Sequence, residues 1–510
     1  MELNIYYQNK TKDRILLTVL FLYIFFPGSL NANTGNHDNQ SASLDIWNSL
    51  IYFYNGSFKI LNKRFILSYE NPSPELEKAL TIEAIKKDPR MACVYPARYK
   101  YLVNENLIRN QDIFCEDFEE YKKKVPVDQL YYIFASKNYR SITSMMGHGM
   151  IATQGINEEG KSSSHSFSFF ADLSEYNLAE LIYGSFFGGI NGGLVLRPLN
   201  SELDRYLQKE GRELWQLELN LSTEKKELLK SALWELKEAE PRYLFHKFNC
   251  ATLLNYTLGI IAPEILEHHS LFTSPLDIYR ALQDEGYIKS IQIRYAANTI
   301  DQLGSDHQTV QPTSELQDSS VGAYYKHGYH FKFMGASHYF NTPQVGTTSQ
   351  TALKLGAIDI NLSENKIEEV ALYEYLDSAK KNGLTYHFFT GYSRSDYRES
   401  DHAIANISLS AGKTWRNDTL SVSLLSGLKL QPKDIGNATF ESFFSYKLSD
   451  YATITKSILY QTDFEKDLYN FNFKLNSRIS KNYVFYLGVE KKKPRDDNKL
   501  VIFSGIDYYF

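Results

Sequence analysis

The sequence is short of cysteine, proline and net charge. Its 510 residues include 3 Cys and 14 Pro, and the formal net charge at pH 7 is -5. Acidic and basic residues are well mixed, which argues against a nucleic-acid partner, because such a surface needs a basic field to attract phosphates. After the N-terminal apolar run, which is treated below, no segment is long and apolar enough for a transmembrane helix.

The length and the aromatic content narrow the class of protein. A chain of 510 residues exceeds one ordinary core, so we expect two or more domains. Tyr and Phe contribute 38 and 31 residues, although the mean hydropathy is negative. This combination is typical of outer-membrane barrels, whose strands need an apolar residue only at every second position, together with aromatic girdles.

The N-terminus has the pattern of a secretory signal peptide, which we expect over residues 1–32. Lys10, Lys12 and Arg14 precede the apolar run 15–26, and a small-residue cleavage site follows. The apolar run is too short for an ordinary spanning helix, although an uncleaved anchor is the alternative. The sequence therefore predicts export across the secretory membrane.

If the protein is exported, its three cysteines can be interpreted in terms of an oxidising compartment. Cys93 and Cys115 are close in sequence and are candidates for a disulfide in an oxidising compartment, which would leave Cys250 as the odd thiol. Three free thiols are the alternative, because cysteine connectivity does not follow from sequence alone.

Changes in hydrophobic periodicity and polarity along the sequence predict four regions after the signal peptide. Residues 33–135 show mainly helical periodicity, and residues 136–290 mix helical and alternating patterns. Residues 291–320 are polar and poorly periodic, as in a linker. Residues 321–510 contain about eleven alternating runs of the length of barrel strands. The predicted fold class is α+β, followed by an antiparallel transmembrane β-barrel of ten or twelve strands.

The end of the sequence supports the barrel. The chain stops at Phe510, and Tyr508 and Ile506 share its face in a period-2 pattern. A last strand ending in Phe resembles the signal by which outer-membrane barrels are recognised, so the barrel-assembly machinery is an expected partner during insertion. A soluble β-sandwich is the alternative, but it seldom has so many long alternating strands with outward aromatic residues.

Three residues form a candidate catalytic site. Cys250 lies at the expected start of a helix, where free N–H groups and the positive end of the dipole favour a thiolate. His148 precedes a strand-like segment and is the candidate base, and His165 on the next strand is the candidate third member. Each also has a structural reading: Cys250 as an apolar filler, and the two histidines as loop or strand-surface residues.

A metal site is the weaker interpretation of the same residues. His246 is four positions before Cys250, a spacing that places two ligands on one helix face. No ligand pair of standard zinc spacing accompanies them. We therefore expect neither a metal nor another cofactor.

Several short segments together resemble the Lnb N-terminal periplasmic domain family. They occur in the family's order, over roughly residues 85–290. The segments are ACVYPAR from Ala92, GH ending at His148, GG-x-x-GG from Gly188, GRELW from Gly211, ALWEL from Ala232 and FNC ending at Cys250. The resemblance implies a permuted papain-like fold, similar to the lecithin-retinol acyltransferase group. It also implies that Cys250 is the nucleophile, His148 the base and His165 the second histidine.

These patterns predict an enzyme attached to the outer membrane, with its N-terminal domain in the periplasm. The expected activity is that of a Cys–His acyltransferase or hydrolase that forms a thioester. Outer-membrane lipid is an expected partner. Lipid or lipoprotein acyl chains are the first candidate substrates, and peptidoglycan amides are the second. A non-enzymatic barrel protein with a periplasmic binding or structural domain is the alternative, and a passive channel is a third interpretation.

Overall fold

The chain forms two compact units, which are described separately. One lies within residues 43–315, and the other lies within residues 316–510. The computed structural model describes residues 46–137, 147–172, 180, 184, 189–244, 248–268, 273–296, 319–338, 352–377, 383–394, 403–417, 419–431, 434–449, 451–462, 467–480, 482–493 and 500–509. The predicted signal peptide, most of the predicted linker and Phe510 lie outside these residues.

The first unit begins with short helices. They are α2 (Ile46–Leu50), α3 (Pro74–Lys87), α4 (Met91–Val94), α5 (Pro96–Asn104) and α6 (Glu116–Lys124), with a small hairpin of β1 (Phe53–Tyr54) and β2 (Ser57–Phe58). Ser73 caps α3 by accepting a hydrogen bond from the Leu76 N–H at 3.1 Å, and Pro74 occupies the first helical position. A disulfide joins Cys93 to Cys115, with 5.4 Å between their Cα atoms.

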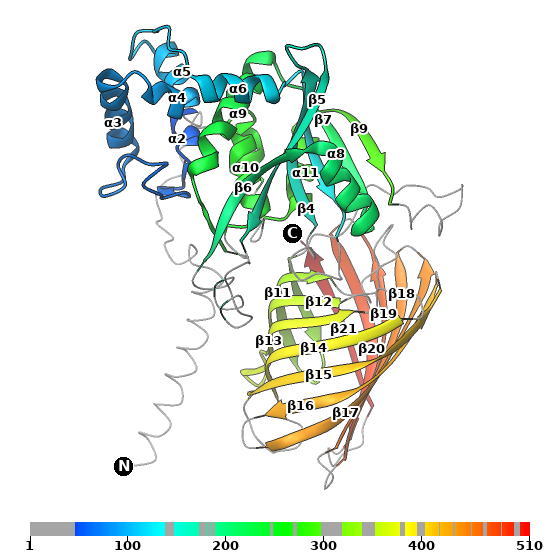
Figure 1. The fold of residues 1–510 in the computed structure, drawn as a ribbon. Helices are drawn as coiled ribbons and strands as arrows, with labels where there is room; N and C mark the ends of the chain where they lie inside the picture. The colour runs from blue at the N-terminus through cyan, green and yellow to red at the C-terminus, as the bar shows by residue number, and fades with distance from the viewer. Residues whose placement is uncertain are drawn as a thin grey trace, which may run out of the picture. The chain divides into compact units, whose positions relative to one another are not determined.

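A seven-stranded antiparallel sheet forms the centre of this unit (Figure 1). Its spatial order is β8-β6-β5-β4-β3-β7-β9. The strands are β3 (Gln129–Ala135), β4 (His148–Ile156), β5 (Ser162–Ala171), β6 (Ile190–Pro198), β7 (Leu214–Leu219), β8 (Arg242–Tyr243) and β9 (Ile288–Arg294). Because successive residues of a strand point to opposite faces, β3, β4 and β7 each contribute side chains to two different cores.

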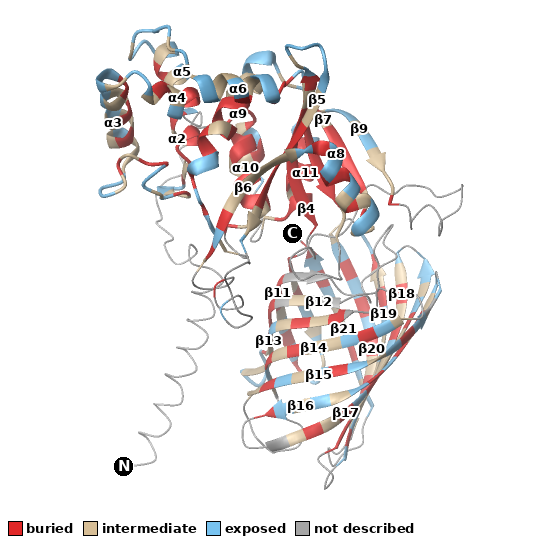
Figure 2. Ribbon diagram, in the orientation of Figure 1, coloured by how far each residue is buried: buried red, intermediate tan, exposed pale blue. Residues whose placement is uncertain are grey.

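Helices of different parts of the chain cover the two faces of the sheet. The larger core contains residues of α9 (Thr223–Glu235), α10 (Cys250–Gly259) and α11 (Pro275–Asp284). The smaller core contains residues of α8 (Leu199–Asp204) and the π-helix η3 (Arg205–Lys209). Two 3₁₀ turns, η4 (Leu236–Glu238) and η5 (Pro263–Glu267), complete the unit. Red strands and helices in Figure 2 mark the buried layers.

Within the described ranges, no helix has the length and apolar character needed to cross a membrane.

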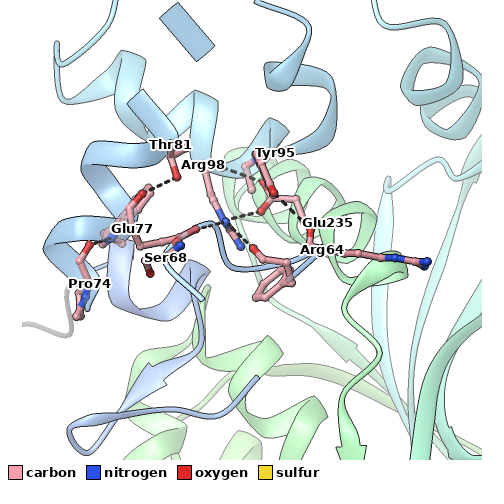
Figure 3. Close-up of polar contacts among 11 residues, drawn as sticks. Arg64, Ser68, Pro74, Glu77, Thr81, Tyr95, Arg98 and Glu235 are labelled. Carbon is pink, nitrogen blue, oxygen red and sulfur yellow. Dashed lines mark hydrogen bonds and ion pairs between the residues drawn. The ribbon is translucent and has the colours of Figure 1, made fainter. Parts of the chain in front are cut away.

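A buried ion cluster joins the N-terminal helices to α9 (Figure 3). The fully buried Arg98 on α5 pairs with Glu77 of α3 at 3.0 Å and with Glu235 of α9 at 3.1 Å. Glu235 also accepts hydrogen bonds from the N–H groups of Ala97 and Arg98. Because buried charges need partners, this cluster ties the α3–α5 region to the rest of the unit.

The predicted boundary between residues 135 and 136 does not separate two compact units. Strand β3, which ends at Ala135, lies between β4 and β7 in the sheet. Trp47 and Ile85 from the N-terminal region belong to the same core as Leu253 of α10. The physical reason is that these short helices cannot bury their apolar sides alone and do so against the sheet domain.

The second unit is a closed antiparallel barrel of twelve strands, β10 to β21. Ser320 at the start of the barrel pairs with Tyr509 near its end, which closes the sheet. The strands are β10 (Ser320–Tyr325), β11 (Tyr329–His338), β12 (Ala352–Asn361), β13 (Lys366–Asp377), β14 (Gly383–Arg394), β15 (Ala403–Arg416), β16 (Leu420–Gln431), β17 (Asp434–Ser449), β18 (Ala452–Thr462), β19 (Asp467–Arg478), β20 (Tyr483–Lys493) and β21 (Leu500–Tyr509). The predicted fold class, α+β followed by a barrel of ten or twelve strands, is confirmed.

The barrel strands alternate between exposed and buried residues (Figure 2), and many of the exposed residues are apolar whereas many of the buried ones are polar. On β16, Leu424 and Leu428 are exposed, whereas Ser421 and Ser423 are buried. An apolar exterior and a polar interior are the arrangement of a barrel that sits in lipid, because closure pairs every backbone group and the outer side chains face hydrocarbon.

Candidate functional site

The first helical turn of α10 places the candidate nucleophile. Asn249 caps the helix by accepting a hydrogen bond from the Thr252 N–H at 2.9 Å, and its amide donates to the Thr273 carbonyl oxygen at 3.0 Å. Cys250 is therefore the first residue of α10. This is the position that the sequence predicted for it, at the positive end of the helix dipole.

Backbone N–H groups from two elements meet at the Cys250 thiol. The Ala251 N–H on α10 and the Gly149 N–H on β4 both favour the thiolate, as does the positive charge of Arg212. Burial outweighs them and raises the pKa of the Cys250 thiol to about 11. The thiol is thus protonated at neutral pH, although the donors that would hold a negative charge are already in place.

The missing side chain of Gly149 leaves room for the Tyr132 hydroxyl beside this part of β4. A Cβ atom at this position would lie 2.5 Å from the Tyr132 hydroxyl oxygen, which is too close for any other residue. The Tyr132 hydroxyl donates a hydrogen bond to the Pro275 carbonyl oxygen at 2.7 Å and so cannot move aside freely. The glycine after His148 is therefore part of the site, and the tripeptide Gly-His-Gly was the available sequence signal for it.

His148 lies on the opposite face of the sheet from Cys250. Its imidazole stacks on Phe170, with 4.9 Å between ring centroids, and on Tyr206 of η3 at 5.9 Å. Met150 and Ala152 follow on the same face and belong to the smaller core, whereas Ile151 points into the core that contains α10. The sheet separates the imidazole from the thiol, so the predicted Cys250–His148 contact is not present.

The surroundings of His148 keep its ring neutral. Burial and the positive charges of Arg212 and Arg205 lower the pKa of His148 to about 3. Within the described part of the chain, its Nε2 atom has no hydrogen-bond partner. An unpaired buried nitrogen costs free energy, so this ring position carries a penalty.

His165 does not orient His148. It lies on the same face as Phe167 and pairs with Thr153, which is four residues beyond Gly149 on β4. At the rise of a strand this places it about 13 Å along the sheet from the thiol. Burial and Lys124 lower its pKa. The three predicted catalytic residues are therefore not assembled as a triad, because the period-2 alternation and the strand register separate them.

Arg212 is a site residue whose role the sequence did not reveal. Its guanidinium donates to the carbonyl oxygens of Ser136 at 2.7 Å and Ala135 at 3.0 Å, and it pairs with Glu210 at 3.0 Å. It thus ties the segment before β7 to the end of β3, while its charge acts on Cys250 and His148. Only the fold reveals this, because Arg212 is far from both in sequence.

Two further residues named from the sequence, His246 and Gly188, are outside the described residues. Within those described, no group of three or more His, Cys, Asp or Glu side chains is placed to hold a metal ion.

Comparison with known proteins identifies the middle of the chain. Residues 117–285 match the model of the Lnb N-terminal periplasmic domain family. No curated protein sequence matches the chain. Solved structures similar to it include KdgM porin in complex with disordered oligogalacturonate (15% identity, 38% of this chain, 98% of that chain, TM-score 0.27). NanC porin (11%, 38%, 98%, 0.27) and Omp33 of Acinetobacter baumannii (10%, 38%, 99%, 0.22) are also similar.

The family match and the barrel together locate the protein. A closed antiparallel barrel with an even number of strands and an apolar exterior is the form that spans outer membranes. The matched family is a periplasmic domain. The protein is therefore an outer-membrane barrel with an N-terminal domain in the periplasm.

Proposed function

We propose that this Lnb N-terminal periplasmic domain, carried on an outer-membrane barrel, is a thiol-dependent acyltransferase or hydrolase. Its substrates are the acyl chains of lipids or lipoproteins, which the barrel keeps within reach. Envelope amides such as those of peptidoglycan are the second substrate class. The observation that supports this proposal is the convergence of the Gly149 and Ala251 N–H groups on Cys250.

The proposed reaction has two steps. The Cys250 thiolate attacks an acyl ester carbonyl and forms a C–S bond, the ester C–O bond breaks, and the leaving alcohol takes up a proton. Water or an acceptor amine then attacks the thioester and releases the thiol. The backbone N–H groups at Cys250 are suited to stabilise the negative charge that develops in both steps.

The base requires a change in the position of His148. His148 is the first residue of β4, and Gly147 before it has a φ of +88°, a backbone conformation open mainly to glycine. We infer that substrate binding turns the ring from its stack on Tyr206 to the α10 face. The unpaired Nε2 atom then gains a partner in the thiol.

A second candidate function follows from the same geometry. A thiol with a pKa of about 11 and a histidine on the other face of the sheet suit a domain that binds a partner without catalysis. In that case Cys250 is an apolar filler at the start of a helix, and His148 is a packing residue.

Capture of the acyl-enzyme distinguishes the two functions. The purified full chain in proteoliposomes would be incubated with diacyl phospholipid, triacylated lipoprotein or peptidoglycan fragments, and peptides containing Cys250 would be analysed by mass spectrometry. We expect a hydroxylamine-sensitive acyl adduct on Cys250, with product release that Cys250→Ala abolishes. Absence of both adduct and Cys250-dependent product with all three substrates would leave the binding domain as the function.

A further inference from the structure

Three inward-facing carboxylates of the barrel are almost completely covered by protein. The side chains of Glu441, Glu374 and Asp507 are exposed by 6%, 10% and 6%. Their neighbours in sequence face outward; Phe440 is 52% exposed and Tyr508 37%. Water in an open lumen would contact inward charges, so their burial means that side chains fill the interior at these levels.

The small hydroxyl side chains of the inner wall are covered as well. Thr385, Thr414 and Ser410 have exposed fractions of 0%, 0% and 1%. Thr385 and Thr414 on neighbouring strands lie within hydrogen-bond distance of each other at 2.5 Å. Short side chains cannot reach the barrel axis, so longer side chains from other strands must lie over them.

One chain of ion pairs joins four strands of the inner wall, and a hydrogen bond connects a fifth strand to it. Lys354 of β12 pairs with Glu374 of β13 at 2.6 Å, and Glu374 lies 3.2 Å from His387 of β14. His387 in turn lies 2.6 Å from Glu441 of β17, which also accepts a hydrogen bond from Ser410 of β15 at 2.8 Å. Contacts between β14 and β17 pass over two intervening strands, so this bridge spans part of the lumen.

A second bridge crosses the wall where the barrel closes. Lys332 of β11 pairs with Asp507 of β21 at 2.9 Å, passing over β10. Lys474 of β19 lies 3.8 Å from the ring centroid of Tyr486, and Lys332 lies 5.3 Å from the same centroid. This second bridge therefore connects strands on both sides of the closure between β10 and β21.

Each bridge passes over a glycine. Gly322 of β10 pairs with both Lys332 and Asp507, and a Cβ atom there would lie 2.0 Å from Asp507 Oδ1. Gly427 of β16 pairs with Ser410, and a Cβ atom there would lie 2.4 Å from Ser410 Oγ. The missing side chains leave the room in which the long side chains cross.

We propose that the barrel is closed to ions and solutes and serves as a membrane anchor, with the two bridges as its seal. A barrel of twelve strands is intermediate between small barrels filled by side chains and wide porins with an aqueous channel. In this barrel the ion pairs that cross between strands fill the lumen that twelve strands would otherwise leave open. This proposal does not depend on the activity of Cys250.

Single-channel recording in planar bilayers tests the seal with the full-length protein. We expect no current steps from the wild type and resolved steps from the double variant Glu441→Ala/Asp507→Ala, which truncates one member of each bridge. The matched control is Glu364→Ala/Asp467→Ala, which removes the same charge from two positions outside both bridges, where Glu364 pairs with Lys366 and Asp467 accepts a hydrogen bond from Tyr460. Glu441→Gln keeps the volume of the side chain and should produce no current steps.

Two outcomes would overturn the proposal. Stable open-channel steps from the wild type would show that the lumen conducts despite the bridges. A double variant that keeps the heat-modifiable gel migration of a folded barrel yet passes no current would show that the bridges are not the seal. Folding is thus measured independently of conductance in every sample.

Discussion

The backbone next to His148 contacts the Cys250 thiol, but the His148 side chain does not. The N–H of Gly149, the residue after His148, contacts the Cys250 thiol. The His148 imidazole instead stacks on Tyr206 across the sheet, with 5.9 Å between centroids. The nucleophile is therefore held beside its oxyanion donors while its expected base is held away from it.

The thiol of Cys250 should react slowly at neutral pH. With a pKa of about 11, only about one thiol in 10⁴ is ionised at pH 7, so alkylation should accelerate about tenfold per pH unit from pH 6 to 9. Cys93 and Cys115 form a disulfide, so a thiol probe under non-reducing conditions reports on Cys250 alone. Mass spectrometry identifies the modified residue, and Cys250→Ser is the blank. A labelling rate that levels off below pH 8 would contradict the expected pKa.

His148 should make the periplasmic unit less stable in mild acid. Its pKa is about 3 when folded and near 6.5 when unfolded, so the unfolded chain binds the extra proton first as the pH falls below 6.5. The loss between pH 6.5 and 5 should be about 2 kcal/mol. His148→Leu should remove this contribution and leave those of His165, whose pKa is also lowered, and Glu235, whose pKa is raised, as measured by urea unfolding followed through tryptophan fluorescence.

The control for this measurement is His268→Leu. His268 is exposed and lies 2.7 Å from Glu285, so its removal should leave the acid loss in place. Three of the four tryptophans, Trp47, Trp215 and Trp234, lie in the periplasmic unit and report on its unfolding. Equal pH profiles for the wild type and His148→Leu would argue against a buried neutral His148.

Arg98→Ala should destabilise the periplasmic unit by about 3–5 kcal/mol, because it leaves two buried carboxylates without their shared partner. Arg64→Ala removes an arginine that pairs with Glu240 on the surface, and it should cost at most about 1 kcal/mol. Denaturant unfolding of both variants gives the comparison. Similar small losses would mean that the buried cluster does not hold the N-terminal helices to α9.

Loss of the disulfide should lower the unfolding free energy of the same unit by about 3 kcal/mol. Cys93 and Cys115 are 22 residues apart, and a loop of this length restricts the unfolded chain by about that amount. Cys93→Ser/Cys115→Ser removes the bond without adding a free thiol. The unfolding midpoint with and without reductant checks the wild type, and the double variant should not respond to reductant.

Much of the fold was predictable because its patterns are local. Alternation along the barrel strands, as at Leu424 and Leu428 against Ser421 and Ser423, follows from the period of a strand with one face in lipid. The start of α10 at Cys250 follows from the capping preference of Asn249. Such signals need no knowledge of distant residues.

The sequence by itself determined the order of the two units, the strand-rich barrel and the position of Cys250 at a helix start, because periodicity and capping act within a few residues. Only the tertiary structure decided that His148 faces away from Cys250, that His165 lies farther along the sheet, and that Glu441 reaches His387 across two strands. Register and strand pairing set these relationships. A shift of one residue reverses the face of every side chain, and no spacing in the chain encodes that choice.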